Sequence, residues 1–178
     1  MNEIEILHYG STTVGLMAIE RNLPARQAER AAAQAVASFL LGREVGIDHH
    51  ADGAPLIADY RGWVSISHSR STVAVAIDPE RAIGIDIEER ERAQRLPKLA
   101  PRVLTSTEIA TYDSPEELLR AWTLKEAAYK AARAGVDFLH DIQLPGDGSR
   151  RITAAGIAVD ILASEPRGPL MLSLVYRH

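Results

Sequence analysis

Two carboxylates near the middle of the chain have a spacing that suits cation binding. Asp86 and Glu88 lie in segment 82–88, whose alternation of apolar and other residues predicts a β-strand. Side chains two apart on a strand project from the same face, and Gly84 leaves room on that face for something to approach the backbone. Carboxylates about 5–7 Å apart at Cβ can share one hard cation. Spacing alone still favours a solvent-facing polar stripe.

A helix predicted over residues 115–134 carries a second group. Trp122, Glu126 and Lys130 follow one another at intervals of four, so they lie on one helix face, and Lys125 is adjacent. Glu126 and Lys130 form an ordinary surface ion pair in the simplest interpretation. Trp122 on the same face favours a partly buried, structured surface instead.

His68 lies between two serines at the end of a predicted strand. Such a histidine, with Ser67 and Ser69 beside it, has the donors to bind a phosphate, but a satisfied structural histidine is the more common case. The other histidines show no metal-ligand spacing, and the chain has neither a glycine-rich phosphate loop nor a nucleophile-elbow serine.

Composition narrows the class of protein. The 178 residues are 46% hydrophobic and 25% charged, which excludes a disordered or fibrous chain. A net charge of −4 gives no general footprint for nucleic acid or an anionic membrane. The absence of cysteine excludes disulfides, thiolate nucleophiles and cysteine-based zinc sites. No apolar run approaches the ~20 residues that span a bilayer, and the N-terminal residues do not resemble a signal peptide. We therefore expect a soluble, cytoplasmic protein.

The order of elements predicts an α+β fold. The N-terminal half is expected to contain strands at 3–8, 12–20, 63–68 and 72–77, with a helix over 23–41. The buried stripe of that helix is expected to comprise Ala28, Ala31, Ala35, Phe39 and Leu40. The C-terminal half is expected to contain strand 82–88, a short helix capped at 105–108, the helix 115–134 ended by Gly135, and strands at 137–143, 150–154, 157–163 and 169–176. A turn is expected at 165–168.

Because strands and helices are segregated within each half, a parallel βαβ sheet is not expected. We place a boundary near residue 80, which gives an N-terminal lobe, 1–80, and a C-terminal lobe, 81–178.

The three motifs occur in an order that resembles a known family. Trp63 and Ser67-His68-Ser69, then Gly84-Ile85-Asp86-Ile87-Glu88, then the run from Trp122 through Lys125-Glu126 to Lys130 resemble the 4′-phosphopantetheinyl transferases, in particular their monomeric two-lobed type. Gly53-Ala54-Pro55 is similar to that family's Gly-Lys-Pro. The resemblance implies two pseudo-symmetric lobes, each a helix on a small, mostly antiparallel sheet, with the active site at the lobe interface.

The resemblance also implies an activity and its residues. Such enzymes move 4′-phosphopantetheine from coenzyme A to a serine of an acyl or peptidyl carrier protein and release adenosine 3′,5′-bisphosphate. Asp86, Glu88 and Glu126 would then hold Mg²⁺, and Glu126 would also activate the serine. Lys130, with help from Lys125, would contact the pyrophosphate.

The same resemblance also implies which residues contact the 3′-phosphate of coenzyme A and which contact the carrier protein. His68, with Ser67 or Ser69, would contact the 3′-phosphate. Arg26, or alternatively Arg30, would supply a second contact. An acidic carrier helix would meet exposed residues near 94–112, such as Arg95, Lys98, Arg102 and Val103. Neither nucleic acid nor membrane is expected as a partner.

Some positions depart from the family pattern. Ala54 replaces the usual lysine, and Gln34 stands where related chains often carry an arginine, so less positive charge is expected around the nucleotide. Two interpretations therefore remain open, an active transferase and a weakened or non-catalytic relative that binds coenzyme A or a carrier protein. A Mg²⁺-dependent nuclease or phosphatase is a third class, which the missing basic stripe disfavours.

Overall fold

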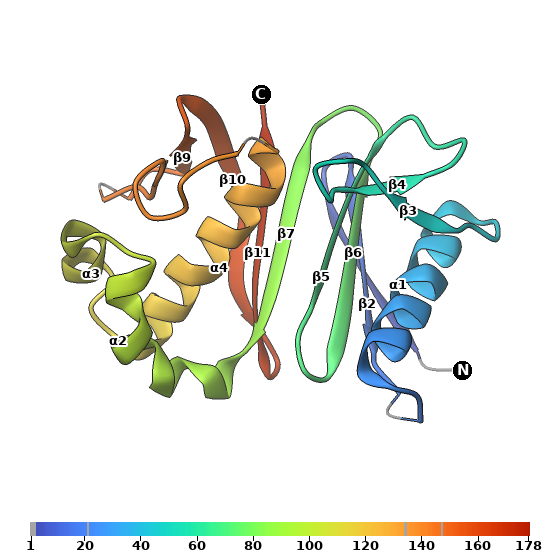
Figure 1. The fold of residues 1–178 in the computed structure, drawn as a ribbon, viewed down its shortest axis with the longest axis horizontal. Coiled ribbons are helices and arrows are strands. Elements are labelled where there is room, and N and C mark those ends of the chain that lie inside the picture. The colour runs from blue at the N-terminus through green and yellow to red at the C-terminus, as the bar shows by residue number, and fades with distance from the viewer. Residues whose placement is uncertain (1–2, 21, 134, 147) are drawn as a thin grey trace.

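The computed structural model describes residues 3–20, 22–133, 135–146 and 148–178, and its elements form two lobes side by side (Figure 1). The first lobe has a four-stranded antiparallel sheet in the order β1-β2-β6-β5 and one long helix, α1. Its elements are β1 (Ile4–Tyr9), β2 (Thr12–Ala18), α1 (Ala25–Leu41), β5 (Trp63–His68) and β6 (Thr72–Asp78). A small hairpin of β3 (Ile47–His49) and β4 (Pro55–Ile57) lies between α1 and β5, where no strand was predicted.

The second lobe repeats this plan with a five-stranded antiparallel sheet, β7-β11-β10-β9-β8, and helix α4. Its strands are β7 (Ile83–Glu89), β8 (Ile142–Gln143), β9 (Arg151–Ala154), β10 (Ile157–Arg167) and β11 (Leu170–Arg177). Between β7 and α4 (Pro115–Ala132) lie the short helices η1 (Arg90–Arg95), α2 (Leu96–Leu99), η2 (Ala100–Arg102) and α3 (Ser106–Thr111). The α+β fold of two sheets, each covered by a helix, is confirmed.

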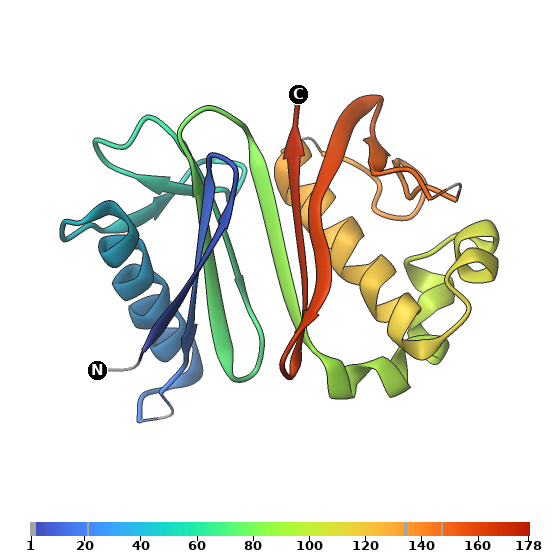
Figure 2. The same cartoon turned by 180° about the vertical axis from the view of Figure 1, so that it is seen from behind.

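The two helices cover the outer faces of the molecule, and the two sheets meet in the middle (Figures 1 and 2). One apolar cluster lies under α1 and a second lies under α4. A third joins the lobes, because Val14 and Ala74 of the first sheet belong to the same cluster as Ile85 and Leu172 of the second. The layers are therefore helix, sheet, sheet and helix.

The lobes also meet along the edge strands β5 and β7, which belong to different sheets but lie side by side. Two serine hydroxyls of β5 replace the missing backbone ladder. The Ile85 amide donates to Ser65 Oγ at 3.0 Å, and the Ile87 amide donates to Ser67 Oγ at 3.2 Å. Buried amides need such partners, so these bonds fix how far β7 lies along β5. We call this contact the seam.

Helix α4 lies on the face of β7 that carries Asp86 and Glu88. A Cβ on Gly84 would lie 1.9 Å from the Ala127 carbonyl oxygen, so only glycine allows this close approach. The room predicted at Gly84 is therefore filled by the α4 backbone. This packing rules out a simple solvent-facing stripe, and it brings Glu126 and Lys130 to the strand carboxylates.

The predicted buried face of α1 is only partly confirmed: Ala28 is buried and Leu40 packs against the core, but Ala31 and Ala35 are exposed. The helix buries Ala28, Ala32, Ala33, Val36 and Ala37, whereas Phe39 is 59% exposed. Alanine occurs around much of this helix, so apolar periodicity could not select a face. The helix packs on β2 through Val36, which lies directly over Gly15. A Cβ on Gly15 would come within 2.5 Å of Val36 Cγ1, so the glycine allows this contact.

Several predicted ends also differ. Helix α4 stops at Ala132, and Arg133, not Gly135, takes the left-handed conformation at its C-terminus, with φ 52°. The expected last helical residue, Ala134, lies outside the described residues. Of the strand expected over 137–143, only the last two residues are strand, and β10 continues to Arg167 through the expected turn. The predicted cap at 105–108 is confirmed, and the Ser114 side chain caps the N-terminus of α4. No helix in the described part of the chain is long and apolar enough to cross a membrane.

Replacing Gly84 by alanine should lower the free energy of unfolding by about 2–3 kcal/mol, because the new methyl group meets helix backbone that cannot move aside. Gly46→Ala is the matched control, since a Cβ there meets nothing within 4 Å. Urea denaturation of both variants measures the difference. Equal stability of the two variants would contradict the close packing of α4 on β7.

Candidate active site at the seam

Asp86 is the central residue of the candidate site. Its carboxylate is 6% exposed, and one oxygen, Oδ1, accepts two hydrogen bonds. Ser67 Oγ donates from β5 at 2.8 Å, and Lys130 Nζ donates from α4 at 2.8 Å. Lys130 also donates to the Ile85 carbonyl oxygen at 2.9 Å. The group therefore joins both lobes, and each partner comes from a different element.

Glu88 lies one strand repeat further along the same face. Arg92 of η1 forms an ion pair with it, and the Arg92 guanidinium lies 5.6 Å from the centre of the Trp122 ring. Burial raises the pKa of Glu88 above its usual value, Arg92 opposes that change, and the charges of Asp86 and Glu89 add to it. Glu88 is thus held in place by a cation although its surroundings disfavour its charge.

Glu126 projects from α4 toward the same carboxylates. No described residue gives it a hydrogen bond or an ion pair, although it is only partly exposed. Burial raises its pKa, and the nearby charge of Asp86 raises it further, while Lys130 lowers it. A carboxyl group in this situation favours either a proton or an added cation.

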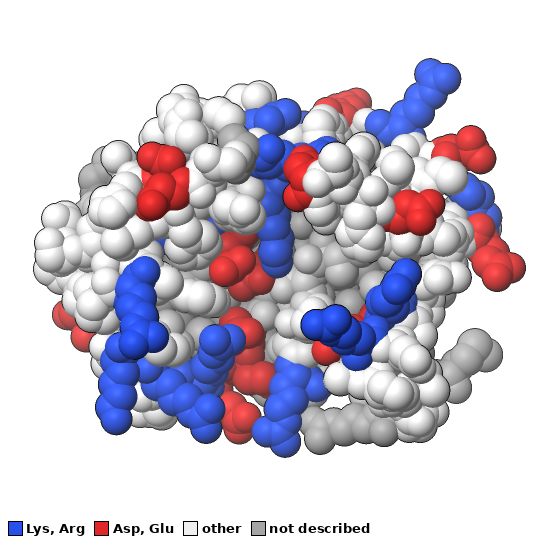
Figure 3. Space-filling model, in the orientation of Figure 1, with Lys and Arg blue, Asp and Glu red and all other residues white. Residues whose placement is uncertain are grey.

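The three carboxylates fit a divalent cation by their chemistry. All supply hard oxygen donors, and the unfavourable ionisation of Glu88 and Glu126 is what a bound cation relieves. Across the described ranges, no three acidic or histidine side chains already converge as a ligand set. Asp86 and Glu88 are instead turned toward Lys130 and Arg92. Figure 3 shows acidic and basic side chains gathered down the middle of this face, over the junction of the lobes.

The structure does not bring Lys125 to this site. Its side chain is 0% exposed in the core of the second lobe, where Nζ pairs with Glu108 Oε2 at 2.9 Å and donates to the Leu139 carbonyl at 3.1 Å. The expected contact of Lys125 with a pyrophosphate is therefore wrong for this geometry. Adjacent helix positions point about 100° apart, so Glu126 and Lys125 cannot share a face.

Ser67 and Ser69 also have roles other than the expected phosphate contact. Ser67 binds Asp86, and Ser69 Oγ donates to Glu89 Oε1 at 2.8 Å. Both serines face β7, whereas His68 points to the opposite face of β5 and is exposed. The grouping of His68 with its neighbouring serines is thus corrected by strand alternation.

His68 lines a cavity of about 300 Å³ between α1 and the β3–β4 hairpin. Arg30 and Gln34 of α1 also line this cavity, but Arg26 does not, so the structure favours Arg30 over the preferred candidate Arg26. An acidic residue faces the histidine, since Glu29 Oε2 lies 3.6 Å from His68 Nε2.

A second cavity of about 440 Å³ adjoins the first and extends to the seam. Gly53, Pro55 and Ile66 line both cavities, and Ala54, Ser65 and Lys130 line the second. Arg133 at the end of α4 spans the lobes here, because it pairs with Asp52 at 3.0 Å and lies 5.6 Å from the Trp63 ring. The two neighbouring cavities extend from His68 to Lys130, which binds Asp86, and together we call them the interlobe channel.

Sequence reasoning missed two cations near the site and one acid in the core of the second lobe. Arg92 follows Glu88 by four residues, and this spacing is a sequence signal for their ion pair. Arg133 has no sequence signal, because its partner Asp52 is distant in the chain. Glu108 was recognised as a capping-box acid, and its second role as the partner of Lys125 was not predictable from spacing.

The chain is similar in sequence to known proteins. Residues 82–165 match the sequence model of the 4′-phosphopantetheinyl transferase superfamily. The chain is 31% identical to 4′-phosphopantetheinyl transferase HetI of Nostoc sp. over 111 residues, which is 57% of this chain and 47% of HetI. It is 33% identical to enterobactin synthase component D of Salmonella typhi over 141 residues, which is 72% of this chain and 55% of that protein.

These findings place residues 82–165 in the 4′-phosphopantetheinyl transferase superfamily, and they confirm the resemblance drawn from the motifs. The chain spans about half the length of the curated relatives it matches.

Replacing Glu126 by glutamine should stabilise the metal-free protein at neutral pH. An acid with a raised pKa in the folded state loses stability as pH rises through that pKa, and glutamine removes this loss. The advantage of the variant should vanish below about pH 4, where Glu126 is protonated in both states. Urea denaturation from pH 3.5 to 8 measures it. A difference that does not change with pH would show that Glu126 is an ordinary exposed acid.

Proposed function

We propose that this protein transfers 4′-phosphopantetheine from coenzyme A to a serine of an acyl or peptidyl carrier protein, in a Mg²⁺-dependent reaction. The observation that carries the proposal is the proximity of Asp86, Glu88 and Glu126 to one another and to Lys130, which lines the interlobe channel. The superfamily match over 82–165 supports the same reaction class.

Asp86, Glu88 and Glu126 would hold the divalent cation. Bound there, Mg²⁺ supplies charge neutralisation for the pyrophosphate. Lys130 is the nearest protein cation, and it is 26% exposed, so it can reach a phosphate at the channel mouth while its stem stays packed.

In the proposed reaction the carrier serine oxygen attacks the β-phosphorus of coenzyme A. The bond from that phosphorus to the bridging oxygen breaks, and adenosine 3′,5′-bisphosphate leaves. Glu126 accepts the serine proton, directly or through one water.

The nucleotide end of coenzyme A would lie in the cavity beside His68. His68 and Arg30 offer cationic contacts to a 3′-phosphate, but Glu29 faces the same space, and Ala54 supplies no charge. This part of the channel is less positive than a tight 3′-phosphate site requires.

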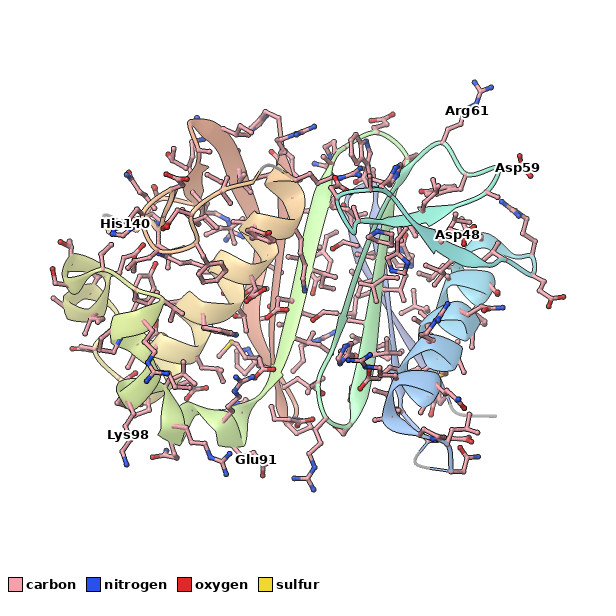
Figure 4. All side chains as sticks on the ribbon, viewed as in Figure 1. Asp48, Asp59, Arg61, Glu91, Lys98 and His140 are labelled. Carbon is pink, nitrogen blue, oxygen red and sulfur yellow. The ribbon has the colours of Figure 1, made fainter. Side chains whose placement is uncertain are left out.

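The carrier would dock beside the seam, on the segment from η1 to η2. Arg95, Lys98 and Arg102 are exposed there, and Val103 is half-buried. Figure 4 shows Lys98 pointing outward from this segment, away from the core. Exposed positive side chains suit an acidic carrier helix.

One chain contributes both sides of the seam, so we propose that it acts as a monomer. Coenzyme A as the donor favours a cytoplasmic reaction.

The alternative is a relative that binds coenzyme A or a carrier without transfer. The pairing of Asp86 with Lys130 beside an unpaired Glu126 favours catalysis, because a binding protein needs no such costly group of like charges.

Incubation with coenzyme A, Mg²⁺ and an apo carrier protein should add one phosphopantetheine to the carrier, seen by mass spectrometry. Asp86→Ala should slow this by about a hundredfold or more, because a buried group that organises the site is lost. Asp48→Ala, on an exposed part of β3, is the control and should match the wild type. Binding of coenzyme A without any mass gain would establish the alternative, and an unaffected Asp86→Ala variant would overturn the assigned site.

A further inference from the structure

Arg92 has contacts that exceed those of a surface arginine. It pairs with Glu88, and its guanidinium lies over the Trp122 ring. Its charge also lowers the pKa of Glu126, so it acts on two carboxylates of the site. Arg92 therefore links η1, on which it lies, to two other elements, β7 and α4.

The described site contains three carboxylates and two internal cations. Lys130 is bound to Asp86, and Arg92 is bound to Glu88. A divalent cation that enters must compete with Arg92 for Glu88, since one carboxylate cannot bind both at full strength.

Arg92 is also free to leave. Its side chain is 42% exposed and projects from a short 3₁₀ helix, so it can turn away from Glu88 into the solvent. A guanidinium binds phosphate oxygens in a bidentate manner, so a pyrophosphate at the channel mouth is a strong competitor for it.

We propose that Arg92 is a positioning residue that occupies Glu88 until the pyrophosphate of the substrate draws it away, so that the divalent cation binds together with coenzyme A and not before it. This rests on the proposed function, because it assumes a pyrophosphate substrate. It makes metal and coenzyme A binding mutually reinforcing, and each raises the affinity for the other by the same factor.

The test is direct titration of the purified protein with Mn²⁺, in place of Mg²⁺, with and without coenzyme A. Without coenzyme A, Arg92→Gln should bind Mn²⁺ about tenfold more tightly than the wild type, because one charge-assisted competitor is gone. Coenzyme A should then tighten Mn²⁺ binding less in this variant than in the wild type.

Three further variants complete the test. Arg92→Lys keeps a cation and should resemble the wild type, and Arg92→Met keeps the packing on Trp122 and should resemble Arg92→Gln. Arg90→Gln is the matched control, since Arg90 lies on the same 3₁₀ helix and pairs with Glu116, which is outside the site.

Unchanged or weaker Mn²⁺ binding in both Arg92→Gln and Arg92→Met would overturn the proposal, as would an equal gain in Arg90→Gln. The titration needs no carrier and no turnover. If the carrier assay shows no transfer while Arg92→Gln still tightens Mn²⁺, the proposed function fails and the competition at Glu88 stands. If transfer occurs but Mn²⁺ binding does not respond to Arg92, only this inference fails.

Discussion

The arrangement of the site depends on two serine hydroxyls that join edge strands of different sheets. Ser65 and Ser67 accept the amides of Ile85 and Ile87, so the lobes meet in one register without a backbone ladder. The Ser67 hydroxyl also donates its one proton to Asp86. The same hydroxyl therefore fixes the seam and orients the central carboxylate. An amide left unpaired there would cost about 1–3 kcal/mol, so a shift of one lobe against the other is disfavoured.

The ion pairs and pKa shifts of the site depend in turn on how α4 packs against β7. Gly84 lets α4 approach β7, which places Lys130 on Asp86 and leaves Glu126 without a partner in the described structure. Burial then works against the ionised forms of Glu88 and Glu126, and this is a cost that folding alone does not explain. Such a cost is typical of a site that binds a cation or moves a proton. The second lobe offsets part of it with its own buried core, including the Lys125–Glu108 pair.

Much of this could be predicted from the sequence, because strand alternation and helix spacing are local. Alternation grouped Asp86 with Glu88, and helix spacing grouped Glu126 with Lys130. The family resemblance joined the two groups, and their meeting requires only that the helix cover the strand. The predictions that failed concern side chains whose positions depend on residues distant in the chain. The buried face of the alanine-rich α1, the core position of Lys125, and the use of Ser67 at the seam are set by tertiary contacts that spacing does not encode. The preference for Arg30 over Arg26 likewise depends on which turn of α1 faces the cavity.

The most direct measurement is the rate of carrier modification by Ser67→Ala compared with Ser65→Ala. Both changes leave one β7 amide without its acceptor, so both loosen the seam by a similar amount, but only Ser67 also binds Asp86. The account predicts a rate at least about tenfold lower for Ser67→Ala, the factor that corresponds to one hydrogen bond to a charged group. Equal rates for the two variants would contradict it, because Asp86 would then be held in place without Ser67.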